Sequence, residues 1–202
     1  SSICRKIYGN LSDEAKDDKQ NEVKSPYTPN ISLPIDEQFT MHFKNNGGKF
    51  IYCENLNEIS ENFENILAEN DWFEKEVICF DSKLFKLLEE NRLSPDGNND
   101  RATFFLTSCE NLVADEGSIL FSSNQLKHFK PNELPTNMIV FATTSQITGT
   151  KGDGLRRIKN AHEKNYPTNI TTIKYFEEVK EQDFLHYGSC HKNLYLLLLE
   201  DL

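Results

Sequence analysis

Apolar and polar positions change period several times between residue 35 and residue 202, and this predicts strands that alternate with helices. Short runs of branched and aromatic residues favour strands, whereas apolar residues three or four apart favour helices. The predicted strands are residues 49–53, 76–80, 103–106, 118–121, 138–143, 169–175 and 194–199. This alternation predicts an α/β fold class: a single three-layer domain with a mostly parallel sheet. The continuously apolar run 194–199 is typical of a strand buried on both faces.

Local signals place the helices between these strands. A helix is predicted over residues 35–46, with two Phe residues four apart on one face. Asn55 has a glutamate three positions later, as in a capping box, and Leu56 begins the apolar face of the helix that follows. Asp81 is predicted to cap the next helix. The last helix is predicted from about residue 155 to 164, after a glycine-rich entry.

Residues 1–34 predict a mobile N-terminal arm that precedes an α/β domain over residues 35–202. Apolar residues are sparse in the arm, its charges are mixed, and Pro26, Pro29 and Pro34 interrupt any helix. The opening residues contain no long apolar segment, so no intact signal peptide is expected there. No run approaches the ~20 apolar residues that a membrane-spanning helix needs.

The segment CENLVADEGSILFSSNQ, residues 109–125, is the most informative part of the sequence. A helical or turn-like run over residues 112–114 is expected to end at Glu116-Gly117. A strand then follows, closed by Ser122-Ser123-Asn124-Gln125. A glycine followed by a hydroxyl at such a corner can bring backbone N–H groups close to an anion. The alternative is a tight corner in which Gly117 supplies a positive φ and the hydroxyls satisfy the loop.

This segment resembles the central signature of the LUD-domain family, the lactate-utilization proteins of the LutC/YkgG type. The resemblance extends over residues 36–202: GGKFIYCEN is similar to the family's opening strand, and residues 192–201 are similar to its terminal strand. It implies the fold of ribose-phosphate isomerases, glucosamine-phosphate deaminases and CoA transferases. It also implies an accessory role in the oxidation of lactate to pyruvate beside iron–sulfur partner subunits.

The sequence departs from the family pattern at two other loops. Members usually carry Gly-Pro-Ser-x-Thr-Ala-Asp-Ile-Glu after the penultimate strand, where residues 171–184 read TTIKYFEEVKEQDF. The family's His-Gly-Pro turn is replaced by GSCHK at residues 188–192. Its basic residue after the central strand corresponds at best to Lys127. The sequence therefore indicates a divergent member.

Glu110 is the candidate catalytic residue, as a base or an acyl acceptor. The alternative, which the sequence favours, is that Glu110 caps a following helix through its N-terminal amides. The candidate ligand-binding residues, for a small carboxylate, a phosphate or an acidic cofactor, are Glu110, Gly117, Ser118, Ser122, Ser123 and Lys127.

Other motifs favour simpler interpretations. Cys190-His191, with His186 nearby, is interpreted as a polar turn, because neighbours on an extended strand point to opposite faces. No cluster completes a metal site. The stretch 149–154 lacks the spacing of a phosphate-binding loop and is interpreted as a helix entry with Asp153 near the positive end of the helix.

Composition narrows the classes of partner. The net charge of −10 and the absence of a basic stripe argue against nucleic acid. The five cysteines are widely spaced, which favours a reducing cytoplasm and provides no cluster-binding run. No cofactor is evident in the chain. Two further functions stay open: an isomerase or acyl-CoA transferase-like enzyme that uses Glu110, and a non-catalytic interaction module.

Overall fold

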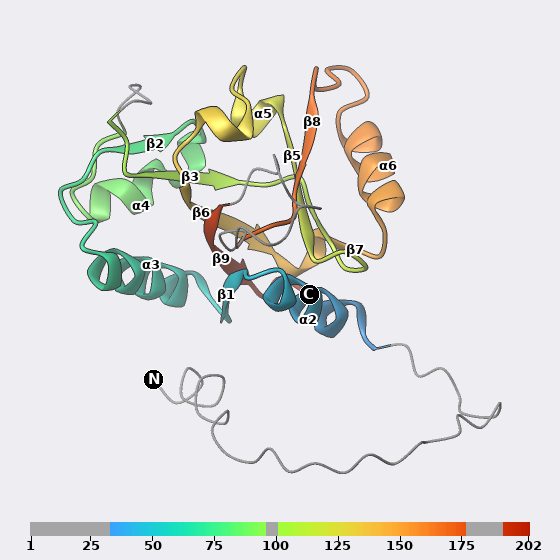
Figure 1. The fold of residues 1–202 in the computed structure, drawn as a ribbon, viewed down its shortest axis with the longest axis horizontal. Helices are drawn as coiled ribbons and strands as arrows, with labels where there is room; N and C mark the ends of the chain where they lie inside the picture. Colours follow the sequence, from blue (N-terminus) through green and yellow to red (C-terminus); the bar gives the residue numbers. More distant parts are fainter. Residues whose placement is uncertain (1–32, 96–100, 177–191) are drawn as a thin grey trace, which may run out of the picture. The chain divides into compact units, whose positions relative to one another are not determined.

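A computed structural model describes residues 33–95, 101–176 and 192–202, and it confirms an α/β protein. Its main sheet has five strands, all parallel, in the order β1-β9-β6-β3-β2 (Figure 1). These strands are β1 (Lys49–Cys53), β2 (Val77–Cys79), β3 (Phe104–Ser108), β6 (Asn137–Thr143) and β9 (Asn193–Leu199). All five lie on or within two residues of the bounds predicted from the apolar runs.

The main sheet is buried on both faces, as its long apolar runs predict. Along β9, Leu194, Leu196 and Leu198 face one core cluster, whereas Tyr195 and Leu197 face the other. Because successive side chains of a strand point to opposite faces, both sides of a central strand must be apolar. β9 lies between β1 and β6, which explains why its run shows no alternation.

Helices cover one of these two faces. α3 (Leu56–Asn70) and α4 (Phe85–Glu90) pack there with Trp72, which stacks on Phe104 at a centroid separation of 5.1 Å. The predicted cap of α3 is confirmed, since the Asn55 side chain accepts hydrogen bonds from two backbone amides of the first turn. The expectation for Leu56 is wrong: its side chain is 67% exposed, at the first position of the helix.

The opposite face is covered by α2 (Ile35–Asn45) and by a second sheet that the sequence did not predict as a separate layer. In α2 both predicted Phe side chains are fully buried. The second sheet is mixed and has the order β7-β4-β5-β8. Its strands are β7 (Ile147–Thr148), β4 (Asn111–Val113), β5 (Ser118–Ser122) and β8 (Ile170–Ile173).

Residues 112–114 were expected to form a helical or turn-like run, and this expectation is wrong. The chain forms an antiparallel hairpin of β4 and β5 there. Leu112 and Val113 are both fully buried, on opposite sides of a short strand, which a helix of this length could not achieve. The corner expected at Gly117 is present, with a φ of 61°. A side chain at Gly117 would collide with the backbone of α2 at His42 and Phe43.

α6 (Lys151–Ala161) begins four residues before the predicted start. Thr150 is its N-cap and forms a reciprocal capping box with Asp153, which outweighs the low helix propensity of the two glycines in the first turn. Gly154 also permits close packing on the second sheet, since a Cβ there would lie 2.7 Å from the Leu120 side chain. Asp153 does lie near the positive end of the helix, as predicted.

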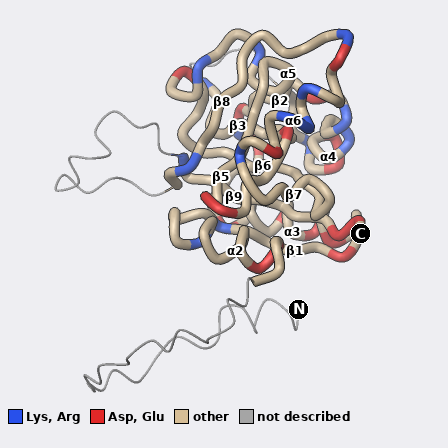
Figure 2. The backbone as a smooth tube through the Cα atoms, turned by 90° about the vertical axis from the view of Figure 1, so that its right-hand side faces the viewer, with Lys and Arg blue, Asp and Glu red and all other residues tan. Residues whose placement is uncertain are grey.

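Charge is distributed unevenly over the helices. α3 contains four glutamates and no Lys or Arg, whereas α6 carries four basic residues and one aspartate. In Figure 2, basic segments lie on α6 and acidic segments lie around the C-terminal end of the chain. Among the described helices, none is long and apolar enough to cross a membrane.

Several predictions concern residues outside the described ranges. These are most of the N-terminal arm, the loop at 96–99, and the region of His186, Cys190 and His191. Within the described residues, no group of three or more His, Cys, Asp or Glu side chains could hold a metal ion.

Candidate functional site

The carboxyl ends of the parallel strands bring polar residues together at one edge of the main sheet. Asp81 follows β2, Glu110 follows β3, Gln146 follows β6, and Asp201 follows β9. Open α/β sheets bind their ligands beyond this edge, because the loops that follow the strands converge there.

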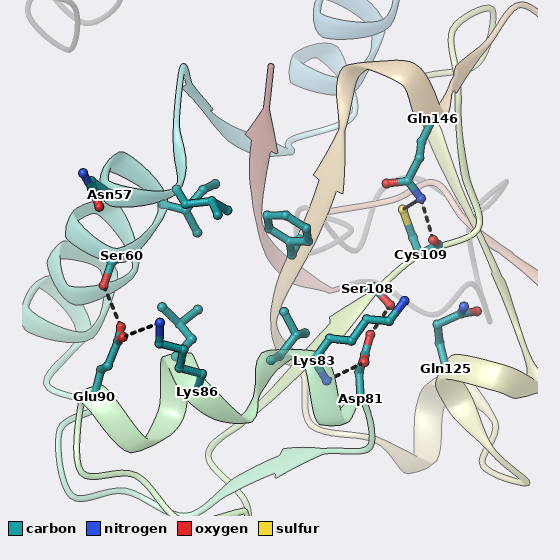
Figure 3. A pocket seen from close by; sticks show the side chains of 15 residues that line it. Asn57, Ser60, Asp81, Lys83, Lys86, Glu90, Ser108, Cys109, Gln125 and Gln146 are labelled. Atoms are coloured by element: carbon teal, nitrogen blue, oxygen red, sulfur yellow. Dashed lines mark hydrogen bonds and ion pairs between the residues drawn. The ribbon is translucent and has the colours of Figure 1, made fainter. Parts of the chain in front are cut away.

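A cleft of about 750 Å³ opens at this edge, between the start of α3 and the η1–α4 segment, in which η1 is the 3₁₀ turn Ser82–Leu84 (Figure 3). Two of the polar edge residues, Asp81 and Gln146, line it together with residues of the helices. Its lining residues are Leu56, Asn57, Ile59, Ser60, Asp81, Lys83, Leu84, Lys86, Leu87, Glu90, Ser108, Cys109, Gln125, Phe141 and Gln146.

Asp81 and Ser108 form the polar floor of the cleft. The Ser108 hydroxyl donates a hydrogen bond of 2.7 Å to Oδ2 of Asp81, while Oδ1 accepts one from the backbone N–H of Lys83 at 3.0 Å. Asp81 thus caps η1, as predicted from sequence. The Lys83 side chain lies along the cleft wall above this pair (Figure 3). Among the described residues, its ammonium group has no carboxylate within salt-bridge distance.

The outer rim of the cleft carries a second polar group. Ser60 donates to Glu90 at 3.2 Å, and Lys86 lies 3.8 Å from the other carboxylate oxygen of Glu90. Both charged side chains are solvent-exposed, so this pair contributes little to stability. It does connect α3 to α4 across the cleft mouth (Figure 3).

Cys109 and Gln146 close the cleft on the side of the second sheet. Nε2 of Gln146 donates to the carbonyl oxygen of Cys109 at 2.7 Å, and Oε1 accepts from the backbone N–H of Thr143. Burial raises the pKa of the Cys109 thiol well above its usual range, which disfavours its thiolate form. Burial likewise raises the pKa of Cys79 to about 11.

Asp201 holds the turn that carries Gln146. Its carboxylate accepts hydrogen bonds from the hydroxyl and the backbone N–H of Ser145, at 2.6 and 2.8 Å. These bonds lower the pKa of Asp201 to about 2, against the opposing effect of desolvation. The segment after β9 therefore positions one wall of the cleft.

Glu110 lies beside the cleft, at the centre of a polar cluster. Its Oε1 accepts hydrogen bonds from Ser122 Oγ at 2.6 Å and from Gln125 Nε2 at 3.1 Å, with Asn124 Nδ2 at 3.3 Å. Its Oε2 lies 3.2 Å from Nε2 of His162. Burial opposes ionisation, but these hydrogen bonds outweigh it and lower the pKa of Glu110.

The predicted role of Glu110 as a cap for a following helix is wrong, because the residues after it form β4. Its hydrogen bonds instead join the residue before β4 to two other segments. These are the junction of β5 and α5 (Ser123–Leu126) and the C-cap of α6. Sequence reasoning missed His162, which comes from a helix more than fifty residues away. The only signal available was a histidine at a predicted helix end.

The structure brings together only some of the predicted binding residues. Ser122 and Ser123 lie with Glu110, where Ser122 is the N-cap of α5 and Ser123 accepts a hydrogen bond from the backbone N–H of Thr168. Gly117 and Ser118 lie at the opposite end of the β4–β5 hairpin. Ser118 is fully buried and donates to Glu116. Lys127 donates to the carbonyl oxygen of Asn124, close to α5.

Comparison with known proteins agrees with this architecture of a parallel sheet, a second mixed sheet and a cleft at the carboxyl edge. The family model described as LUD domain matches residues 69–198, more than half of the chain, and the chain therefore belongs to the LUD-domain family. This domain is associated with lactate-utilization proteins.

A solved structure supports the fold independently. The crystal structure of a DUF162 family protein from Deinococcus radiodurans is similar to 83% of this chain and 96% of that chain, with a TM-score of 0.59. At 14% sequence identity, this likeness shows the fold alone. No curated protein matches the sequence.

Proposed function

We propose that this chain is a LutC/YkgG-like accessory protein of lactate utilization that binds a carboxylate or an acidic cofactor in the cleft. The observation that carries the proposal is the cleft at the carboxyl edge of the main sheet, with the cationic Lys83 on its wall. In this role the chain acts beside iron–sulfur partner subunits that oxidise lactate to pyruvate. The family membership supports that context, and the cleft supports ligand binding.

The predicted residues Glu110, Ser122 and Ser123 do not line the cleft, but they lie next to the wall that Gln125 forms. Gln125 both lines the cleft and donates to Glu110, so the cluster fixes the orientation of this wall. Lys83 is the group best placed to attract an anion, because its ammonium is exposed at the cleft and has no ion pair among the described residues. An anionic ligand in the cleft is bound by the Lys83 ammonium and does not contact the Glu110 carboxylate, because Glu110 does not line the cleft.

The enzymatic alternative, an isomerase or acyl-CoA transferase-like activity, is less well supported. The fold resemblance to those enzymes favours it, but both carboxylate oxygens of Glu110 have hydrogen-bond partners, and Glu110 does not line the cleft. A catalytic base or nucleophile needs a free oxygen within reach of the substrate. Glu110 is better suited to hold neighbouring elements in place.

Calorimetric titration of the full chain tests the proposal. The panel contains lactate, pyruvate, sugar phosphates, acyl-CoAs, and nicotinamide and flavin cofactors. We expect at least one anionic compound to bind, and we expect Lys83→Ala to weaken that binding tenfold or more. Lys75→Ala is the matched control, since Lys75 is an exposed lysine remote from the cleft lining. Binding that is equally strong in Lys83→Ala, or no binding by any compound, contradicts the proposal.

A further inference from the structure

The size of the cleft indicates which class of ligand it accepts. At about 750 Å³ it falls in the range of roughly 300–1,000 Å³ typical of pockets that enclose drug-sized molecules and cofactors. Lactate and pyruvate are three-carbon acids and fill only a small part of such a space. A ligand that matches the cleft is therefore several times larger than lactate.

The cleft also has an apolar wall that the protein itself leaves uncovered. Leu56 is 67% exposed, and Phe141, on the central strand β6, is only half-buried. Both line the cleft, between the start of α3 and the carboxyl end of the sheet. Apolar surface in water is unfavourable, and an aromatic ring offers a flat face for another planar group. This wall therefore favours a ligand with a planar group that packs on Leu56 and Phe141 and removes their apolar surface from water.

The polar residues of the cleft add two further requirements. Lys83 offers a cation without an ion pair among the described residues. Asp81 offers a carboxylate in which each oxygen accepts one protein hydrogen bond and keeps a further lone pair for a ligand. A simple fatty acid satisfies Lys83 but places its chain against the Asp81 carboxylate. A ligand with an anion, hydroxyl donors and a planar group satisfies all three features.

We propose that the cleft binds a nucleotide, with its phosphate at Lys83, its ribose hydroxyls at Asp81 and its base over Leu56 and Phe141. A charge-assisted contact between ammonium and phosphate supplies affinity, and hydroxyl bonds to a fixed carboxylate supply orientation. This inference rests on the proposed function of the cleft as the ligand site, and it specifies the acidic cofactor as a nucleotide.

Titration of the full chain with AMP, adenosine, ribose 5-phosphate and lactate tests the inference. We expect AMP to bind at least tenfold more tightly than adenosine or ribose 5-phosphate, since each of these lacks one recognised part. Lys83→Met should reduce AMP affinity to that of adenosine and leave adenosine unchanged. Leu56→Ser, which removes apolar surface without adding charge, should weaken AMP and adenosine together and leave ribose 5-phosphate unchanged. Lys75→Met is the control for general loss of positive charge.

The outcomes separate this inference from the proposed function. Lysine-dependent binding of lactate, pyruvate or a fatty acid without nucleotide binding overturns the nucleotide but keeps the anion site. AMP binding that is insensitive to both Lys83→Met and Leu56→Ser places the nucleotide elsewhere and overturns the inference. Absence of binding by every compound in both panels overturns the inference and the proposed function together.

Discussion

Glu110 is a carboxylate held by donors from two other elements. Ser122 and Gln125 donate to one of its oxygens, and His162 approaches the other. Only 11% of the Glu110 side chain is exposed. If one hydrogen-bond partner is lost, bulk water therefore cannot reach the polar atom that is left unpaired. We therefore expect the main effect of changing Glu110 to be on stability rather than on ligand contact.

Replacement of Glu110 by Gln should lower the free energy of unfolding at pH 7 by about 1–3 kcal/mol. The folded-state pKa lies below the ordinary value of 4.5, so the stabilisation is present above that pH and is lost as the pH falls through the folded pKa. The stabilities of Glu110→Gln and the unaltered protein in urea should therefore converge as the pH falls from above 4.5 through the folded-state pKa of Glu110. A constant difference over the whole pH range contradicts this role, and Glu61→Gln serves as the exposed control.

Gly117 is the other residue whose chemistry is fixed by its position. Its φ of 61° is costly for a residue with a Cβ, and a side chain there would collide with the α2 backbone. We expect Gly117→Ala to destabilise the protein by more than about 1 kcal/mol, measured as a lower Tm. Gly149→Ala is the control, because its Cβ would meet only Asp153, at 3.6 Å. Equal effects of the two variants contradict the explanation.

Among the elements, α3 has the clearest local signal and also forms the wall of the cleft. Its N-cap, Asn55, accepts hydrogen bonds from the amides of Asn57 and Glu58 at 3.0 and 3.1 Å. Asn55→Ala should lower the free energy of unfolding by about 1 kcal/mol, whereas Asn55→Asp should retain most of it. Chemical denaturation of both variants measures this. A loss in Asn55→Asp as large as in Asn55→Ala contradicts a capping role.

The strands of the main sheet could be predicted because their apolar runs are long and bounded by turn residues. β5 is close to its predicted bounds, but β4 could not be predicted. Its three residues, Asn111–Val113, are too few to show a period, and their pairing with β5 decides their conformation. Glu110, Ser122 and Ser123 could be proposed as candidates from one contiguous motif, although none of them lines the cleft. Lys83, Phe141 and His162 could not, since only the folded topology brings their elements to the same edge.

At the scale of the whole molecule, the two sheets share one core. The cluster on one face of the main sheet includes Phe105, Val140 and Leu196 from that sheet and Leu112 and Phe121 from the hairpin. On this face, neither sheet buries its apolar side chains without the other. The described domain should therefore unfold as one cooperative unit rather than sheet by sheet.

Trp72, the single tryptophan, lies against the opposite face of the main sheet and reports on this cooperativity. We expect its fluorescence and the far-UV circular dichroism to change at the same urea concentration. Two transitions at different concentrations show that the second sheet unfolds separately. The control is Trp72→Phe, whose unfolding is followed by circular dichroism alone. Its urea midpoint, compared with that of the unaltered protein, shows how far the tryptophan itself affects stability.

The position of β9 between β1 and β6 has a consequence for synthesis on the ribosome. β1 hydrogen-bonds only to β9 within the main sheet, and β6 needs it on one side, so neither is fully paired until the last strand has emerged. Until then the nascent chain presents two unpaired strand edges and uncovered apolar faces, the features that recruit chaperones and promote aggregation.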